Sequence, residues 1–236
     1  MPDLRLRQCE EASNVAELEL KPVKTRILTP KDNIVDAIEE YAKDMVGPDD
    51  VISVAESVVA ITQGRVIRPE EIKPSWAARI LCRFVAQKGS LSSVYGMQAA
   101  MNAEGTGRVV YAFIMGVLGK LIGRNGVFYE LAGEQAALID DVTGTMPPFD
   151  KYIVYGPSNP SGVAEEIKQR LGCYGAAVAD VNDLKRAAVL GVTQGLDPKR
   201  LAQILIDNPF GNASQQTPIV IIKNYAKAEA EQLAAG

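Results

Sequence analysis

Apolar residues recur along the chain with two different spacings, which predicts a protein that interleaves helices with strands. The polar segment 1–20 is expected to be a loose arm or an edge strand. After it, Thr29 as the N-cap and Pro30 at the first helical position predict a helix that Gly47 ends. The buried face of this helix is predicted from apolar residues three or four positions apart: Ile34, Ile38, Tyr41, Ala42 and Met45.

The next segment, DDVISVAESVVAITQGRVI (49–67), is rich in β-branched residues. It is expected to be a strand with a turn at Gln63-Gly64 near its end. Ser75 then predicts the N-cap of a second helix. The buried side of that helix is expected to carry Ala77, Ile80, Leu81, Phe84 and Val85.

Strands and helices are also predicted in the second half of the chain. The expected strands lie at 151–156, 176–179 and 218–222. The expected helices lie at about 162–171, closed by Gly172, after Asp197-Pro198, and at the C-terminus. This order indicates an α/β or α+β protein with a mixed sheet. A chain of 236 residues forms one compact domain or two closely packed lobes.

The longest apolar stretch is VVYAFIMGVLGKLIG (109–123). It is interrupted by Lys120 and is too short to span a bilayer, so a buried helix or strand is expected. Its GVLGKL portion resembles a phosphate-binding loop, but Ile114 stands where that loop needs glycine, and Leu121 where it needs a hydroxyl. The glycines are better explained by close packing of the backbone against a neighbour.

The composition excludes several classes of function. There is no histidine, so catalysis by Ser-His-Asp or Cys-His groups is excluded, and a metal would be held by oxygen ligands, as Mg²⁺, Mn²⁺ and Ca²⁺ prefer. The net charge is −4, and no basic stripe with interleaved aromatic residues is evident, so we expect no nucleic-acid partner. Because the longest apolar stretch is too short to span a bilayer, we expect no membrane partner either. Cys9, Cys82 and Cys173 are odd in number and far apart, and the N-terminus lacks a signal-peptide core, which favours the cytoplasm.

Two expected strands end in carboxylates. Asp140 and Asp141 follow one apolar segment, and Asp180 and Asp183 follow another. Acids at two strand ends could bind Mg²⁺ or Mn²⁺ next to phosphate oxygens. Asp and Asn also cap turns and helices by bonding to local amides. Spacing alone favours the turn interpretation.

Two further segments could contact an anion. TQGRV (62–66) is either a turn whose Gly64 amide and Arg65 hold a phosphate or carboxylate, or a plain hairpin turn with an exposed arginine. The polar loop at 208–217 precedes an expected buried strand, a position where loops often carry ligand contacts.

Taken in order, five segments resemble the coenzyme F420-0:L-glutamate ligase (CofE-like) family. That family has a strand ending in Ser-Lys-Ala-Glu-Gly-Arg, then a helix capped by Pro-Ser, a Gly-Ile-Asp-x-Ser-Asn segment, a strand with a proline turn and helix, a strand ending in Ser-Asp-Thr, and a loop before Pro-Val-Val. The corresponding segments are 49–67 followed by IKPSWAARI (72–80), ALIDDVT (137–143), YIVYGPSNPSGVAEEIKQRLG (152–172), VADVNDLKR (178–186) and GNASQQTPIVII (211–222). The resemblance covers residues 22–223, with extra residues near 87–125.

The resemblance implies an α+β mixed-sheet CofE-like fold with two closely packed lobes, assembled as an intertwined homodimer. It also implies a single domain over 21–236 behind an arm at 1–20, with an atypical apolar, glycine-rich segment at 87–125. The implied activity is ligation of L-glutamate to a carboxylate acceptor such as coenzyme F420-0, with GTP as co-substrate and Mg²⁺ or Mn²⁺ as the metal.

The resemblance also implies roles for single residues. For the metal it implies Asp140, with Asp141 as an adjacent alternative, and Asp183 or Asp180. For the nucleotide it implies residues in four segments: Ser57, Gly64 and Arg65, Thr143, and Gly211, Asn212 and Ser214 in the loop that ends at Pro218. No catalytic residue is assigned.

Several departures from the family pattern affect the expected nucleotide site. The family's Leu-Pro-Glu is Thr25, Arg26 and Ile27; its Gln-Lys is Glu56-Ser57; and its second lysine is Ile61. Two lost lysines remove charge-assisted bonds worth roughly 1.5–3 kcal/mol each, for which Arg26 or Arg65 could compensate. The competing hypothesis is therefore a non-catalytic or differently active relative that binds an anionic small molecule.

Overall fold

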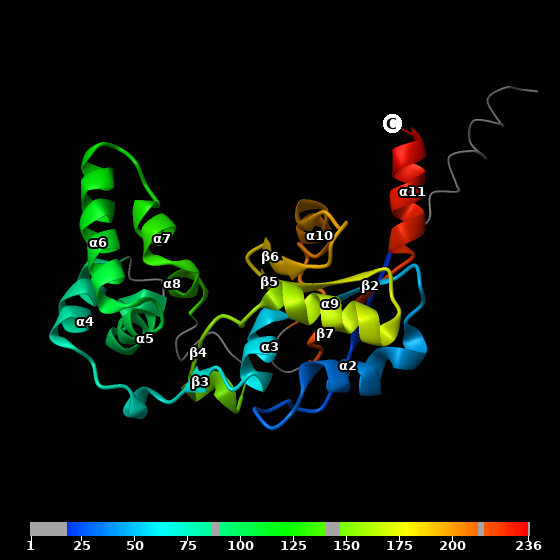
Figure 1. The fold of residues 1–236 in the computed structure, drawn as a ribbon, viewed down its shortest axis with the longest axis horizontal. Helices are drawn as coiled ribbons and strands as arrows, with labels where there is room; N and C mark the ends of the chain where they lie inside the picture. Colours follow the sequence, from blue (N-terminus) through cyan, green and yellow to red (C-terminus); the bar gives the residue numbers. More distant parts are fainter. Residues whose placement is uncertain (1–17, 86–89, 140–146, 212–214, 236) are drawn as a thin grey trace, which may run out of the picture. The chain divides into compact units, whose positions relative to one another are not determined.

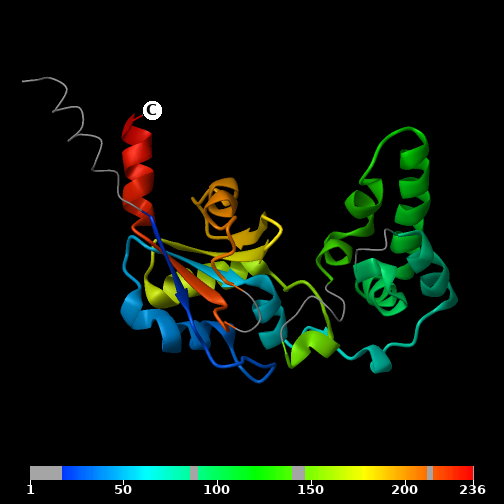
Figure 2. The same cartoon turned by 180° about the vertical axis from the view of Figure 1, so that it is seen from behind.

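The chain forms two compact units within the expected domain (Figures 1 and 2). The computed structural model describes residues 18–85, 90–139, 147–211 and 215–235. The first unit, called the sheet unit, is drawn from residues 1–27, 33–56 and 159–236. The second, called the helical unit, is drawn from residues 28–32 and 57–158.

A five-stranded sheet forms the centre of the sheet unit, with the strand order β1-β7-β2-β5-β6. β2 runs parallel to β5, and the other neighbouring pairs are antiparallel. The strands are β1 (Glu19–Val23), β2 (Val51–Ala55), β5 (Gly175–Asn182), β6 (Arg186–Val192) and β7 (Ile219–Lys223). This mixed sheet with helices confirms the α+β class and the predicted strands at 176–179 and 218–222.

Helices cover both faces of this sheet, so β2 in its middle is buried on either side (Figure 1). Leu201 and Leu205 pack on one face in a cluster with Val51. On the other side, α9 contacts β5 and β6, and α2 packs against α9. The helices of the sheet unit are α2 (Ile34–Ala42), continued by the 3-10 helix η1 (Lys43–Met45), α9 (Pro160–Leu171), α10 (Pro198–Ile204) and α11 (Tyr225–Ala235).

Local capping explains where these helices begin and end. Gly172 adopts φ +66° and closes α9, and Asp197 accepts the Lys199 amide at the start of α10, both as predicted. The first helix begins at Ile34, not at Pro30, because the Asn33 side chain accepts the amide of Val35 at 2.8 Å. Thr29 instead donates from its amide to Asp32 in a turn (2.7 Å), so the prediction of Thr29 as the cap is wrong.

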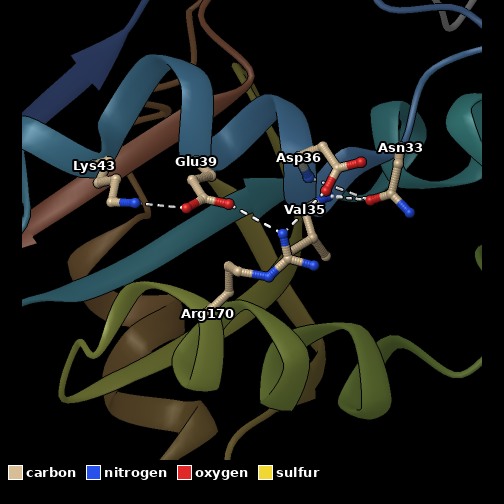
Figure 3. A network of polar contacts seen from close by, with 6 residues as sticks. All are labelled: Asn33, Val35, Asp36, Glu39, Lys43 and Arg170. Atoms are coloured by element: carbon tan, nitrogen blue, oxygen red, sulfur yellow. Dashed lines mark hydrogen bonds and ion pairs between the residues drawn. The ribbon is translucent and has the colours of Figure 1, made fainter.

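An ionic cluster joins α2 to α9 (Figure 3). Arg170 donates to Asp36 at 3.1 Å and to Glu39 at 3.0 Å. Lys43 donates to the other oxygen of Glu39 at 2.7 Å. These side chains lie on the surface, where an ion pair contributes at most about 1 kcal/mol, so the cluster orients the helices more than it stabilises them.

The segment predicted as one strand over 49–67 is instead a strand, a helix and a second short strand. β2 ends at Ala55, and α3 (Glu56–Thr62) begins at once. The β-branched residues at 58, 59 and 61 are buried within α3, so packing overrides their preference for strands. The sequence pattern could not reveal this, because a continuous apolar run fits a buried helix as well as a buried strand.

The helical unit consists mainly of short helices around one apolar cluster that includes Met97, Met101 and Ala112. Ser75 caps α4 as predicted, by accepting the Ala78 amide at 3.2 Å. The α-helices are α3, α4 (Trp76–Leu81), α5 (Val94–Glu104), α6 (Thr106–Leu121), α7 (Val127–Ala132) and α8 (Glu134–Leu138). The 3-10 helices are η2 (Pro69–Glu71), η3 (Cys82–Phe84), η4 (Ser90–Ser92) and η5 (Phe149–Lys151), and the two paired strands are β3 (Val66–Ile67) and β4 (Ile153–Val154).

Two predictions about the helical unit need correction. The side chain of Phe84, predicted to be buried beside α4, is 66% exposed. The strand predicted at 151–156 shortens to β4, because Lys151 belongs to η5.

The apolar stretch 109–123 forms α6, which lies beside α7 (Figures 1 and 2). A Cβ atom at Gly116 would approach the Cβ of Phe128 to 2.9 Å, and one at Gly119 would approach Val127 Cγ2 to 2.7 Å. The glycines therefore permit close packing, as expected. The expectation that the whole stretch is buried is wrong, since its other side is open to solvent. Among the described residues, no helix is long and apolar enough to cross a membrane.

The close approach of α6 and α7 gives a testable difference between two glycines of one helix. We expect Gly119→Ala to destabilise the protein by about 2 kcal/mol, because the added carbon meets Val127 and the Arg124 carbonyl. Gly107→Ala is the matched control: no described atom lies within 4 Å of its added carbon, and alanine favours the helix by about 0.5–1 kcal/mol. Urea unfolding followed by circular dichroism measures both, and equal stability of the two variants would contradict the packing.

A buried carboxylate anchors the start of β2. Asp50 accepts the amides of Gly47 and Asn224 and pairs with the Lys223 ammonium. Burial pushes the pKa of Asp50 upward, but hydrogen bonds from Lys223, Gly47 and Asn224 outweigh it and hold the pKa below its ordinary value. The carboxylate therefore stabilises the fold above its unfolded pKa of about 4, and this contribution is lost as the pH falls through the folded pKa.

We expect Asp50→Ala to lower the free energy of unfolding by about 2 kcal/mol at pH 7, because it removes charge-assisted bonds from a buried site. The difference from the unmodified protein should shrink as the pH falls below about 4. Asp49→Ala is the control: its pair with Lys227 is exposed, so its effect should stay within about 0.5 kcal/mol. If the loss of unfolding free energy in Asp50→Ala is the same at every pH, the electrostatic role of Asp50 is overturned.

Candidate functional site

One edge of the sheet gathers chain segments that are distant in the sequence. β2 and β5 are parallel, with Ala55 opposite Ala179, so the carboxyl ends of both strands lie at the same edge of the sheet. β7 begins there, and the Ala55 amide donates to the Pro218 carbonyl at 2.8 Å. The chain after β1 also lies there, because the Thr25 amide donates to the Gln216 carbonyl at 2.9 Å. Ligands of open sheets commonly bind at the carboxyl ends of parallel strands, so this edge is the candidate site.

The stretch that contains Asp180 and Asp183 forms the tip of the β5–β6 hairpin. Asn182 pairs with Arg186 across the hairpin, and its side chain accepts the Leu184 amide at 3.0 Å. Lys185 completes the turn with φ +57°. The turn interpretation of this stretch is therefore confirmed for Asn182. In the described part of the chain neither aspartate side chain caps this turn, so both remain candidates for other contacts.

Asp183 is linked to the loop that follows α10. The Asn208 side-chain amide donates to Asp183 Oδ1 at 2.6 Å and to the Gly211 carbonyl at 3.3 Å. A predicted metal ligand and the first residue of the predicted nucleotide loop are thus brought together by one side chain. Lys185 pairs with Asp207 beside them, which further ties the hairpin tip to this loop.

The backbone conformation of this loop requires particular residue types at two positions. Gly211 has φ +67°, a backbone conformation that favours glycine. Asn208 also has a positive φ of +52°, which asparagine tolerates better than most residues. The Thr217 hydroxyl donates to the Phe210 carbonyl and closes the loop before β7.

Asp180 differs from Asp183 in its surroundings. It lies on β5 opposite Ala188, and nearby protein atoms displace enough water to raise the pKa of its carboxyl. The residue nevertheless remains exposed to solvent. A carboxylate that is partly desolvated but open on one side is well suited to accept a cation.

Two positions that carry lysine in the family pattern cannot supply a cation here. Ile61 is buried in an apolar cluster with Phe149 and Val154. Ser57 lies in the first turn of α3 and is partly buried, next to the buried Glu56. Arg26 is exposed after β1, where its guanidinium donates to the Ile27 carbonyl at 3.3 Å.

Gly64 and Arg65 belong to the helical unit. Gly64 adopts φ +69° after α3. Arg65 donates to the Gly156 carbonyl at 2.6 Å and to Gln135 at 2.8 Å, and its guanidinium lies 5.8 Å from the ring centre of Tyr155. The arginine is therefore a partly buried structural residue and not the exposed arginine of a plain hairpin turn. Its predicted contact with an anion stays a prediction.

Several expected site residues lie outside the described residues: Asp140, Asp141, Thr143, Asn212 and Ser214. The expectation that the carboxylates of 140 or 141 meet those of 180 or 183 stays a prediction. Among the residues that are described, no group of three or more His, Cys, Asp or Glu side chains could hold a metal ion.

The sequence interpretation missed Asn208. The local sequence Asn-Pro-Phe-Gly carries a turn signal, and an asparagine at such a turn often bonds to nearby backbone. The contact with Asp183 could not be inferred, because 25 residues separate the two positions.

The link between Asp183 and Asn208 predicts a local change in mobility. We expect Asp183→Ala to release the Asn208 side chain and to speed amide hydrogen exchange over 205–211 by about fivefold, the equivalent of one lost hydrogen bond. Asp207→Ala is the control, because its pair with Lys185 is fully exposed to screening and should change exchange little. Mass spectrometry of peptic fragments measures the exchange, and identical exchange in the two variants would show that the link does not hold the loop.

Comparison with known proteins adds one finding. The model of the F420-0:gamma-glutamyl ligase family matches residues 22–181 of the chain. The match includes the end of β1, all of β2 and α3, and β5 as far as Val181, but it stops before Asp183 and the loop at 211–218. No curated protein matches the chain.

Proposed function

Because the chain belongs to the F420-0:gamma-glutamyl ligase family, we propose that it joins the amine of L-glutamate to a carboxylate of coenzyme F420-0 or a similar acceptor. In this reaction a nucleotide donates a phosphoryl group to the acceptor carboxylate. The amine then attacks the activated carbon, the amide bond forms and phosphate leaves. The observation that carries the proposal is the family match, together with the link between Asp183 and the loop at 211–218.

The metal in this proposal is Mg²⁺ or Mn²⁺, held by Asp140 and Asp183, with Asp180 or Asp141 as a further ligand. The residues fit such an ion in kind, because carboxylates are hard oxygen donors and the chain has no histidine. When bound, the ion would neutralise the phosphate charge. Asn208 orients Asp183 for that role by holding one of its oxygens, which leaves the other oxygen to face the ligand.

The nucleotide in this proposal is GTP, bound along the loop of Gly211, Asn212 and Ser214, with Thr143 and Ser57 as further contacts. In this proposal Arg26 compensates for one lost lysine. Its position supports this role, because the neighbouring Thr25 amide bonds to the Gln216 carbonyl at the candidate edge. Gly64 and Arg65 complete the proposed phosphate contacts. Their support is the resemblance of TQGRV to the family's segment.

The proposed assembly is the intertwined homodimer of the family, and the proposed compartment is the cytoplasm. The first rests on family membership alone. The second is supported by Cys82 and Cys173, which are free, buried thiols.

A second candidate function is binding of an anionic small molecule without ligation. It is favoured by one observation: Ile61 is buried in an apolar cluster, where a lysine in the family pattern would present its charge. Without this lysine the chain would bind a triphosphate more weakly. A smaller anion such as a carboxylate would need fewer cations.

Calorimetry with Mn²⁺ and GTP, separately and together, tests the proposal. We expect binding of GTP only with the metal, and Asp183→Asn should weaken it by at least about tenfold because the variant loses the charge that attracts the ion. Asp207→Asn, a neighbouring exposed carboxylate, should bind as the unmodified protein does.

The same proteins are then incubated with F420-0, L-glutamate, GTP and Mn²⁺, and products are measured by mass spectrometry. A product heavier by one glutamyl residue supports the ligase. Metal-dependent GTP binding without this product would favour a different acceptor. Absence of GTP binding at millimolar concentration, with retained binding of an anionic small molecule, would replace the ligase by the binding protein.

A further inference from the structure

Positive charge is concentrated in one part of the sequence. Residues 72–129 contain seven Lys and Arg residues and a single acid, Glu104, which gives this segment a charge of +6. Since the whole chain has a charge of −4, the remaining residues carry −10. The described part of this segment forms α4 to α6 and the first half of α7 in the helical unit. This segment of the helical unit therefore carries a charge opposite to that of the rest of the chain.

The same segment exposes a row of apolar side chains on α6. We call them the α6 stripe: Tyr111, Ile114, Val117, Leu118, Leu121 and Ile122. Each side chain is between 44% and 81% exposed, and the last two are the most open. Positions three, four and seven apart lie on one side of a helix, so the members of the α6 stripe are neighbours.

The α6 stripe lies opposite the face by which α6 packs in the helical unit. Ala112, Gly116 and Gly119 are buried on the inner face, where the two glycines meet α7. At 100° per residue, the α6 stripe is centred roughly half a turn away from these three residues. α6 is thus apolar on two sides, and α7 covers only one of them. Contiguous exposed apolar surface of this kind marks an interaction site more often than a structural accident.

The charge around the α6 stripe decides which partner suits it. Arg108, Lys120 and Arg124 lie on or just after α6, and the acids facing them are Glu104 and Glu130. Both ion pairs have a length of 2.8 Å. The Arg124–Glu130 pair is exposed on both sides, and such a pair binds weakly enough to yield to another anion, whereas Glu104 is mostly buried beside Arg108. A second copy of the chain would bring one positive segment against another. An anionic lipid surface would satisfy the apolar and the cationic groups together.

We propose that the helical unit docks on anionic phospholipid bilayers through the α6 stripe. α6 has 16 residues, which makes it about 24 Å long, and it would lie in the plane of the interface. Leu121 and Ile122 enter the acyl boundary, and Lys120 and Arg124 reach the headgroups. This partner was not expected from the sequence, because the stretch 109–123 was assumed to be buried. The proposal goes beyond the ligase activity and does not depend on it.

Flotation of the full chain with vesicles tests the proposal. We expect binding to phosphatidylglycerol vesicles and at least about tenfold weaker binding to phosphatidylcholine vesicles, with a loss of binding between about 0.05 M and about 0.5 M NaCl. Leu121→Glu combined with Ile122→Glu should reduce the binding by at least about tenfold. Both side chains are exposed, so the substitutions should leave the fold intact, which circular dichroism checks.

Leu233→Glu is the matched control, because Leu233 is 80% exposed on α11 of the sheet unit. This variant should bind vesicles as the unmodified chain does. Equal loss in both variants, or binding that ignores lipid charge, would overturn the proposal. Sedimentation velocity without lipid supplies the other outcome: self-association that the double variant abolishes, without vesicle binding, would assign the α6 stripe to a second copy of the chain.

Discussion

The carboxylate and carbonyl of Asp50 connect the three central strands of the sheet unit, and the position of the candidate site depends on this connection. The side chain holds Gly47 before β2 and the Lys223–Asn224 pair at the end of β7. The backbone carbonyl accepts the Tyr174 amide just before β5. With one end of the three strands fixed in this way, their registers place Ala55 opposite Ala179 and next to Pro218 at the other end. The site is therefore positioned by residues about one strand length away from it.

The sequence could predict those parts of the fold that depend on residues close to one another along the chain. The cap at Ser75, the glycine that closes α9, the Asp197-Pro198 start of α10 and the apolar strand β7 all depend on residues within one turn or one strand, and they were predicted correctly. The change from β2 to α3 was missed because burial on all sides removes the period that separates a strand from a helix. The solvent exposure of the outer face of α6 was missed for a related reason. An apolar sequence indicates a tendency to be buried, but it does not show whether a neighbouring element covers each side of the helix.

The candidate site was predictable only in part, because its parts are contributed by different loops. Family resemblance singled out Asp183 and Gly211, and the structure joins them through Asn208, a residue that the sequence interpretation did not use. The loss of lysine at position 61 has a consistent structural consequence, since Ile61 packs among Phe149 and Val154 and a charged side chain there would be buried in apolar surroundings. In the function proposed above, the loss of this cation leaves the metal as the main partner of an anionic ligand.

The two faces of α6 are subject to different physical constraints. On the inner face, Gly116 and Gly119 have no room for a single added carbon atom, so drift at these positions is limited by volume. On the outer face, any side chain fits, and only the solvent or a partner sets a limit. Related sequences should consequently keep glycine itself at the two inner positions. At the outer positions they should keep only the hydrophobic character, while the residue type changes. If hydrophobicity on the outer face persists while its residues change, the surface has been maintained for contact; if polar residues enter freely, it has not.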